Sequence, residues 1–64
     1  MDNKVFKTFS DLMDTLEGSQ EDLTRFTHGN KSAGTRLRKA MQQVKQLAQH
    51  VRVEIQEQKN SVTV

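Results

Sequence analysis

The sequence contains no cysteine and no proline, and only 33% of its 64 residues are apolar. Without cysteine, the chain can form neither disulfides nor thiolate metal sites. Ordinary globular domains are roughly 45–50% apolar, and a chain this short leaves much of its surface uncovered when it folds. We therefore expect one small unit that gains stability by associating with a second copy of itself.

Histidine clusters and long apolar runs are also missing. His28 and His50 are far apart in the sequence and have no carboxylate pair nearby, so we expect no metal site and no cofactor. No stretch approaches the roughly 18 apolar residues of a membrane span, and the charged N-terminus does not lead into a signal-peptide core. Two pairs of acids, Asp11 with Asp14 and Glu17 with Glu21, fall on the outer face of the first helix, where they lack the burial that acid–base catalysis requires. We expect a cytoplasmic protein that is not an enzyme and binds neither a membrane nor a small-molecule substrate.

The apolar residues recur in steps of three and four, which is the spacing of one face of a helix. The first series is Val5, Phe9, Leu12, Leu16, Ser19, Leu23 and Phe26, with Phe6 and Met13 beside it. The second series is Ala33, Leu37, Ala40, Val44, Leu47 and Val51, with Met41, Ala48 and Ile55 beside it. The spacing predicts helices at about 3–27 and about 31–59, a turn at about 28–30 and a frayed tail over 60–64.

The residues between the two series predict a tight turn. Gly29 can adopt the left-handed conformation that ends a helix, and Asn30 or Ser32 can cap the next one. Gly18 weakens the first helix and could kink it, but we expect the helix to continue. A short connection makes the two helices an antiparallel hairpin, so the predicted fold class is all-α. Because one hairpin cannot cover its own apolar stripe, we expect two copies to form a homodimeric four-helix bundle.

Charge is unevenly distributed along the chain. Residues 1–27 carry six acidic and three basic side chains, whereas residues 28–52 carry six basic side chains and no acidic one. The six basic residues are Lys31, Arg36, Arg38, Lys39, Lys45 and Arg52. Together with Lys59, four of them recur every seventh residue and so form one line along the second helix, about 42 Å long at 1.5 Å per residue.

Two interpretations of this basic helix remain open. The acidic first helix and the basic second helix could neutralise each other across the hairpin, as charges beside a helical core often do. Alternatively, the basic residues could bind phosphates. The run of four cations from Lys31 to Lys39 favours phosphates, because a helix N-terminus already attracts anions and a phosphate could dock near Asn30, Lys31 and Ser32.

The segment from Gly29 to Lys39 resembles the bacterial linker-histone-like family of chlamydial type. The shared features are an acidic leading helix, a Gly-Asn-Lys turn, a run of small residues, the Arg36 and Arg38 pair, and a helix continuing past Arg52. The resemblance implies DNA binding and nucleoid compaction without enzymatic activity. Members of the chlamydial type carry a long Lys/Ala/Pro-rich tail that this sequence lacks, so it is similar to the shorter tail-less relatives.

We therefore expect a nucleoid-associated homodimer that binds double-stranded DNA without sequence preference. In this interpretation the phosphate-binding residues are Lys31, Arg36, Arg38, Lys39, Lys45 and Arg52. Two basic helices in one dimer would bridge or bend duplexes. The alternative is a helical protein-interaction or oligomerisation module with no nucleic-acid role, which would leave an apolar patch exposed in the assembled oligomer.

Overall fold

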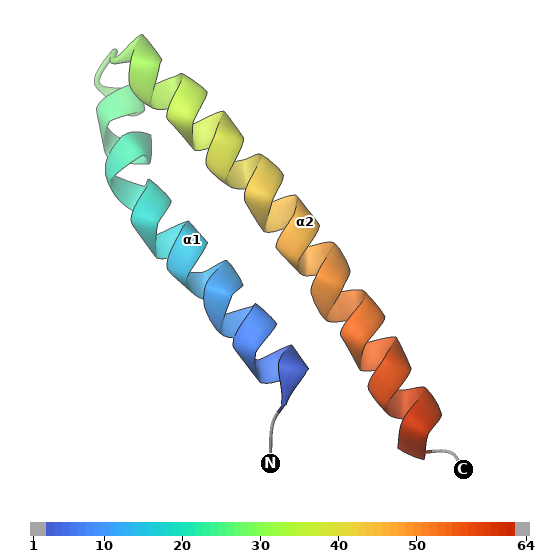
Figure 1. Ribbon diagram of the computed structural model, residues 1–64. Helices are drawn as coiled ribbons and strands as arrows, with labels where there is room; N and C mark the ends of the chain where they lie inside the picture. The colour runs from blue at the N-terminus through green and yellow to red at the C-terminus, as the bar shows by residue number, and fades with distance from the viewer. Residues whose placement is uncertain (1–2, 63–64) are drawn as a thin grey trace.

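The computed structural model describes the backbone of residues 3–62 and the side chains of residues 3–60. The described chain forms two antiparallel helices, α1 (Lys4–Thr27) and α2 (Lys31–Val62), which lie side by side (Figure 1). The predicted all-α hairpin is thus confirmed. α2 continues three residues past the expected end at 59, and residues 63–64 of the expected tail lie outside the described part.

A tight set of backbone hydrogen bonds closes the hairpin at its turn. Gly29 has a φ of +98°, a conformation that strains any residue with a side chain. The Gly29 N–H donates to the Phe26 carbonyl at 2.9 Å, and the Asn30 N–H donates to the Arg25 carbonyl at 3.0 Å. This pair of bonds is the Schellman motif, which satisfies carbonyls left free at a helix end. The glycine therefore fixes the point at which α1 stops and the chain reverses.

Asparagine side chains start both helices. The Asn3 Oδ1 accepts a hydrogen bond from the Val5 N–H at 3.1 Å, and the Asn30 Oδ1 accepts one from the Ala33 N–H at 3.1 Å. Each bond satisfies a backbone donor that has no partner within the first turn of a helix. Of the two cap residues expected at the turn, Asn30 therefore caps α2.

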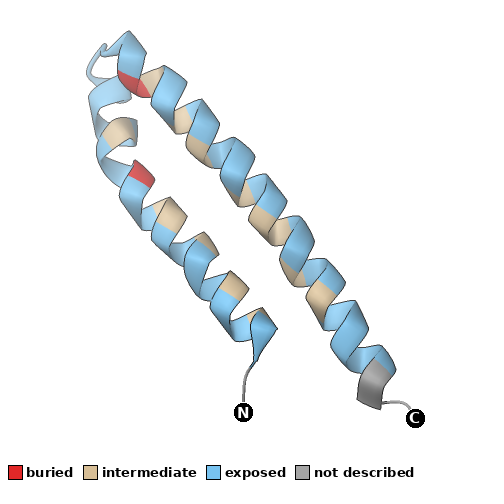
Figure 2. Cartoon of the chain, viewed as in Figure 1, coloured by how far each residue is buried: buried red, intermediate tan, exposed pale blue. Residues whose placement is uncertain are grey.

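Small residues make up the most buried part of the contact between α1 and α2. Ala33 is fully buried and Ser19 is 7% exposed, and the Ser19 hydroxyl donates to the Leu16 carbonyl at 2.7 Å. Half-buried side chains extend the contact along both helices (Figure 2). On α1 they include Val5, Thr8, Leu12, Thr15, Leu16 and Asp22, and on α2 they include Leu37, Ala40, Val44, Leu47, Val51 and Glu54.

Three residues assigned to the core from their spacing are not buried. Phe9 is 53% exposed, and Leu23 and Phe26 are each 50% exposed. Thr8 and Asp22, which directly precede Phe9 and Leu23, are half-buried against α2 instead. Successive residues point about 100° apart on a helix, so both members of such a pair cannot face the same neighbour. The apolar stripe of α1 is wider than the strip that one partner helix covers, and the structure buries only one edge of it.

The two helical glycines differ in their surroundings. α1 continues through Gly18, and a Cβ placed there would meet nothing within 4 Å. A Cβ at Gly34 would lie 2.6 Å from the Phe26 Cδ1 atom. The absent side chain at Gly34 therefore leaves the space in which the Phe26 ring lies against α2.

Candidate nucleic-acid interface

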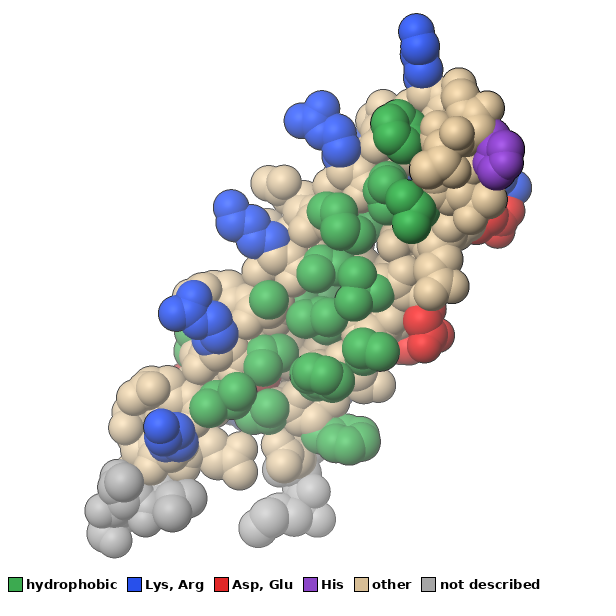
Figure 3. All heavy atoms as spheres, turned by 180° about the vertical axis from the view of Figure 1, so that it is seen from behind, with side chains coloured by type: hydrophobic (Ala, Val, Ile, Leu, Met, Phe, Trp, Pro, Cys, Tyr) green, Lys and Arg blue, Asp and Glu red, His purple; other side chains and the backbone are tan. Residues whose placement is uncertain are grey.

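Five basic side chains follow one line along α2, and we call this line the cation row. It consists of Lys31, Arg38, Lys45, Arg52 and Lys59. All five are exposed, and α2 is a single uninterrupted helix through the whole series. Residues seven apart return to nearly the same side of a helix, so the row is continuous from the turn to the far end of the hairpin. Figure 3 shows the resulting line of Lys and Arg side chains along one edge of the molecule.

The cation row is free of acidic partners among the residues whose side chains the structure describes. The ion pairs there are Arg25 with Glu21 and Arg36 with Asp22, and neither contains a member of the row. The acidic helix α1 therefore does not neutralise the row within a single hairpin. This arrangement leaves the positive charge available to an external polyanion.

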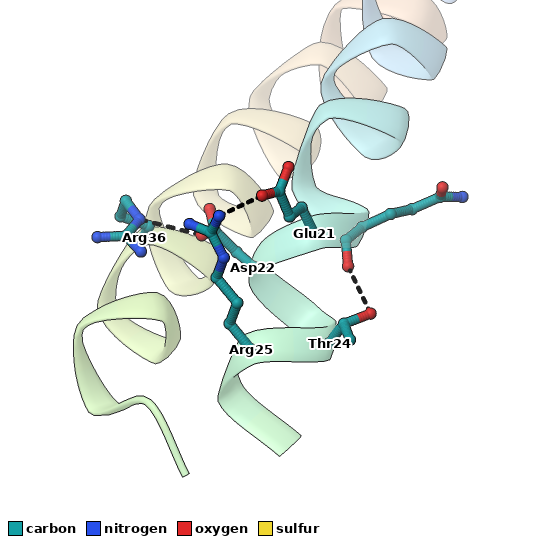
Figure 4. A network of polar contacts seen from close by, with 6 residues as sticks. Glu21, Asp22, Thr24, Arg25 and Arg36 are labelled. Carbon is teal, nitrogen blue, oxygen red and sulfur yellow. Dashed lines mark hydrogen bonds and ion pairs between the residues drawn. The ribbon is translucent and has the colours of Figure 1, made fainter. Parts of the chain in front are cut away.

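Arg36 lies outside the cation row and pairs with α1. Its Nε donates to the Asp22 Oδ1 at 3.0 Å, and Asp22 is 21% exposed (Figure 4). Arg36 precedes Arg38 by two residues, which places the two side chains about 200° apart around the helix. The structure thus separates two basic residues that the sequence places almost side by side. The separation of Arg36 from Arg38 could be predicted from helical spacing alone. That Asp22 is the partner of Arg36 could not, because it depends on how the two helices are aligned in the hairpin.

The Glu21–Arg25 pair lies close to the Asp22–Arg36 pair, within one turn of α1 (Figure 4). Both pairs involve exposed arginines, so each contributes little stability on its own. Their effect on charge is clearer. They neutralise Arg25 and Arg36, whereas the cation row and Lys39 are left without an acidic partner among the described side chains of the hairpin.

Lys39 lies beside the row near the start of α2. Arg38 and Lys39 line a shallow hollow of about 300 Å³ together with Thr35 and Gln42. The hollow therefore combines two cations with hydroxyl and amide groups, all of which can donate hydrogen bonds to a phosphate oxygen. Lys31, Arg38, Lys39, Lys45 and Arg52 are exposed as expected, and Arg36 is the predicted site residue that the fold holds against an acid.

At the start of α2, where the sequence suggested a phosphate site, one of the backbone N–H groups already has a partner within the chain. The Asn30 side-chain oxygen already accepts the Ala33 N–H, so this oxygen acts as a helix cap. Lys31 lies next to it and is exposed. Of Asn30, Lys31 and Ser32, Lys31 is the one that carries a positive charge.

A continuous apolar face borders the cation row (Figure 3). It is formed by exposed large side chains on one side of the hairpin, namely Phe6, Phe9, Met13, Leu23, Phe26, Met41 and Ile55. Near the turn, Lys31 and Arg38 share a hollow with Phe26, and at the other end Lys59 shares a groove with Phe6. The row thus marks one edge of the apolar face over the length of the hairpin.

The histidines lie outside this arrangement. The Nδ1 atom of His28 lies 2.7 Å from the Thr24 carbonyl oxygen at the end of α1, and His50 is exposed on α2. In the described residues, no group of three histidine, aspartate or glutamate side chains is arranged to hold a metal ion. Neither α1 nor α2, over the part described, is long and apolar enough to cross a membrane.

Comparison with known proteins links the hairpin to one family. The family model described as histone H1-like protein Hc1 matches residues 6–61, which include nearly all of both helices and the turn between them. No curated protein and no solved structure matches the chain.

Proposed function

Because the chain belongs to the histone H1-like protein Hc1 family, we propose that it is a nucleoid protein that binds duplex DNA through the cation row. The family match confirms the resemblance noted in the sequence and supports DNA binding in general. It is a match to a histone-like family rather than to an enzyme family. The residues that contact DNA, and the way in which they do so, are our inference from the hairpin.

One observation carries the proposal: five exposed cations lie on one helix edge with no acidic partner among the described side chains. An electrostatic interface with phosphates needs basic groups that are unpaired and arranged along a line. At 1.5 Å per residue the row extends about 42 Å, a little more than one turn of duplex DNA. Lys39 adds a further cation beside Arg38. Contacts of this kind position a protein on the phosphate backbone and do not read base sequence.

Salt dependence gives a quantitative test of this interface. If four to six phosphates are neutralised, by the cation row and Lys39 beside it, log affinity falls with log salt with a slope of about −4 to −5. A gel-shift or fluorescence-anisotropy series on a random-sequence duplex of about 20 base pairs measures this slope. A flat response, or no binding near physiological salt, would contradict the proposal.

A matched pair of variants separates the cation row from net charge. The first variant changes Arg38, Lys45 and Arg52 to glutamine, and the slope should fall in magnitude by about 3. The control changes Lys4, Lys7 and Arg25 to glutamine, which removes the same formal charge from α1 and should leave the slope nearly unchanged. Equal effects of the two triple variants would show that total charge, not the row, determines binding.

We further propose that two copies act together to compact DNA. A homodimer carries two cation rows and can therefore contact two duplexes, or one duplex at two places. Bridging in this sense needs self-association, whereas binding does not. Sedimentation of long DNA with the protein, compared with binding to a short duplex, distinguishes the two activities.

The exposed apolar face favours one alternative, a module that docks a helix of another protein. An apolar patch of this length is unusual on a monomer and marks an interaction surface. The alternative predicts that this face stays open in the protein's own oligomer. If the oligomer covers the face and the cation row stays exposed, DNA binding is the better explanation.

A further inference from the structure

The hairpin exposes more surface than a compact protein of its size. A globular chain of 7.4 kDa exposes about 4,200 Å², whereas this chain exposes 5487 Å². The excess is larger than the roughly 800 Å² per partner that a specific protein–protein interface buries. The large side chains of the apolar face contribute to this extra exposed area, and Phe6 is 77% exposed.

The apolar face is hollow at one end. At the open end of the hairpin, where α1 begins, a groove of about 830 Å³ is lined by Phe6 and Phe9 from α1 and by Val51 and Ile55 from α2. Val5 adds a fifth apolar side chain to its walls, and Asn3, Gln58 and Lys59 supply the polar part of the lining. The open groove exposes apolar surface to water, and a partner that buries this surface would form a more stable complex.

The apolar face is filled out at the opposite end. At the turn, the Phe26 ring lies over Gly34, and Leu23 is half exposed one helical turn earlier. Leu23 is seven and fourteen residues from Leu16 and Phe9, so it lies on the same side of α1 as the groove wall. One end of the face therefore presents bulky apolar side chains, and the other end presents a groove.

We propose that two copies pair through their apolar faces in opposite directions, so that Leu23 and Phe26 of each copy enter the groove of the other. A two-fold axis in the contact plane, perpendicular to the helices, makes both insertions equivalent. Pairing in the same direction would instead place groove against groove and leave both unfilled, which close packing disfavours. The opposite-direction pair is the arrangement in which the two ends of the face complement each other.

This pairing determines where the cation rows lie. Rotation about the stated axis stacks α2 on α2 of the second copy, so that both rows follow the same edge of the dimer. The two rows repel each other through water, and dissolved salt screens this repulsion. Salt should therefore strengthen this dimer. Copies paired in the same direction would instead bring the basic edge beside the acidic helix α1, and salt would weaken that dimer.

The two cation rows on one edge of the dimer also predict an effect of DNA on dimerisation, which rests on the proposed function. A duplex lying along the common edge neutralises both rows, and by linkage DNA should tighten the dimer. The pairing itself does not depend on DNA binding. Self-association is therefore measured in the absence of DNA, so that failure of the pairing and failure of DNA binding are separate results.

Sedimentation equilibrium of the full chain tests the face. Phe6→Ser should raise the dimer dissociation constant at least about tenfold, because each dimer loses two buried rings. Phe26→Ser should do the same, and circular dichroism confirms that each variant is still helical. Val53→Ser is the matched control, because Val53 is 44% exposed but lies two residues from Ile55 and so about 200° away from the apolar face around α2. An unchanged constant in both phenylalanine variants, or a chain that is monomeric up to about millimolar concentration, would overturn the proposal.

Distances between spin labels test the direction. The chain has no native cysteine, so Thr35→Cys and Gln42→Cys each supply one label site, and the two residues lie seven apart on the same side of α2. In the opposite-direction dimer the Thr35 labels should be at least about 10 Å farther apart than the Gln42 labels, because Thr35 lies farther from the axis. Equal distances would overturn the direction.

Salt supplies an independent measurement of the same direction. Between about 50 and 300 mM sodium chloride the dimer should tighten, and the change should shrink in the Arg38→Gln, Lys45→Gln double variant. A dimer that weakens with added salt would contradict the common edge.

Discussion

The Arg36 guanidinium donates a 3.0 Å hydrogen bond from Nε to the Asp22 carboxylate, whereas Arg38, two residues further on, has no ion pair with any described side chain. The first arginine links the two helices of the hairpin, and the second belongs to the exposed cation row. Two chemically identical side chains in one short segment are therefore in different surroundings, one paired and one unpaired.

Arg36→Gln should lower stability and spare DNA affinity, whereas Arg38→Gln should lower DNA affinity and spare stability. Arg36→Gln removes the partner of a half-buried carboxylate and should lower the free energy of unfolding by about 0.5 kcal/mol, with little change in affinity. Arg38→Gln should leave stability unchanged and weaken DNA binding about five- to tenfold near 100 mM salt. Urea unfolding and fluorescence anisotropy measure the two quantities. Equal losses of affinity in the two variants would place Arg36 in the interface as well.

Gly18→Ala should stabilise the protein and Gly34→Ala should not. Replacing a glycine inside a helix by alanine favours the helix by about 1 kcal/mol, and a Cβ at Gly18 meets nothing. At Gly34 the new Cβ would lie 2.6 Å from the Phe26 ring, which must move away from α2. Thermal unfolding at one fixed chain concentration compares the two variants. A matching gain at Gly34 would mean that the ring shifts at no cost.

Gly29→Ala should destabilise the turn. The positive φ at this residue costs about 1–2 kcal/mol for a residue with a side chain, and the two hydrogen bonds that end α1 depend on it. Gly29→Asn is the conservative control, because asparagine tolerates the left-handed region better than alanine. Urea unfolding should rank the parent above Gly29→Asn and Gly29→Ala last, and a different order would contradict this account of the turn.

Filling the apparent gap in the apolar series at Ser19 should be harmful. Ser19 is 7% exposed between the helices, so Ser19→Leu forces α1 and α2 apart and should lower the free energy of unfolding by about 1–3 kcal/mol. Ser19→Ala keeps the close approach and should be neutral or slightly stabilising, since it removes only a hydroxyl that bonds within its own helix. Chemical unfolding of the two variants is the measurement, and a stabilising leucine would mean that the helices are not closely packed at this point.

Much of the hairpin could be predicted from the sequence, because the determining interactions are local. The three- and four-residue spacing predicts both helices, and Gly29 followed by Asn30 predicts the turn, since a left-handed glycine and a side-chain cap act within a few residues of themselves. The seven-residue spacing of the cation row is also a local property, and it holds for any uninterrupted helix.

The sequence by itself thus determined two helices, a turn between them and a line of cations, because backbone hydrogen bonding and helical geometry require no distant partner. Only the tertiary structure decided which side of each helix faces the other. In the folded hairpin Ser19 is buried and Asp22 is half-buried, whereas Phe9 and Phe26 lie on an open face. Arg36 has an acidic partner, and Arg38 has none among the described side chains. The physical reason is that a stripe wider than one contact can be buried along either edge, and the choice depends on how closely small residues such as Ala33 let the helices approach.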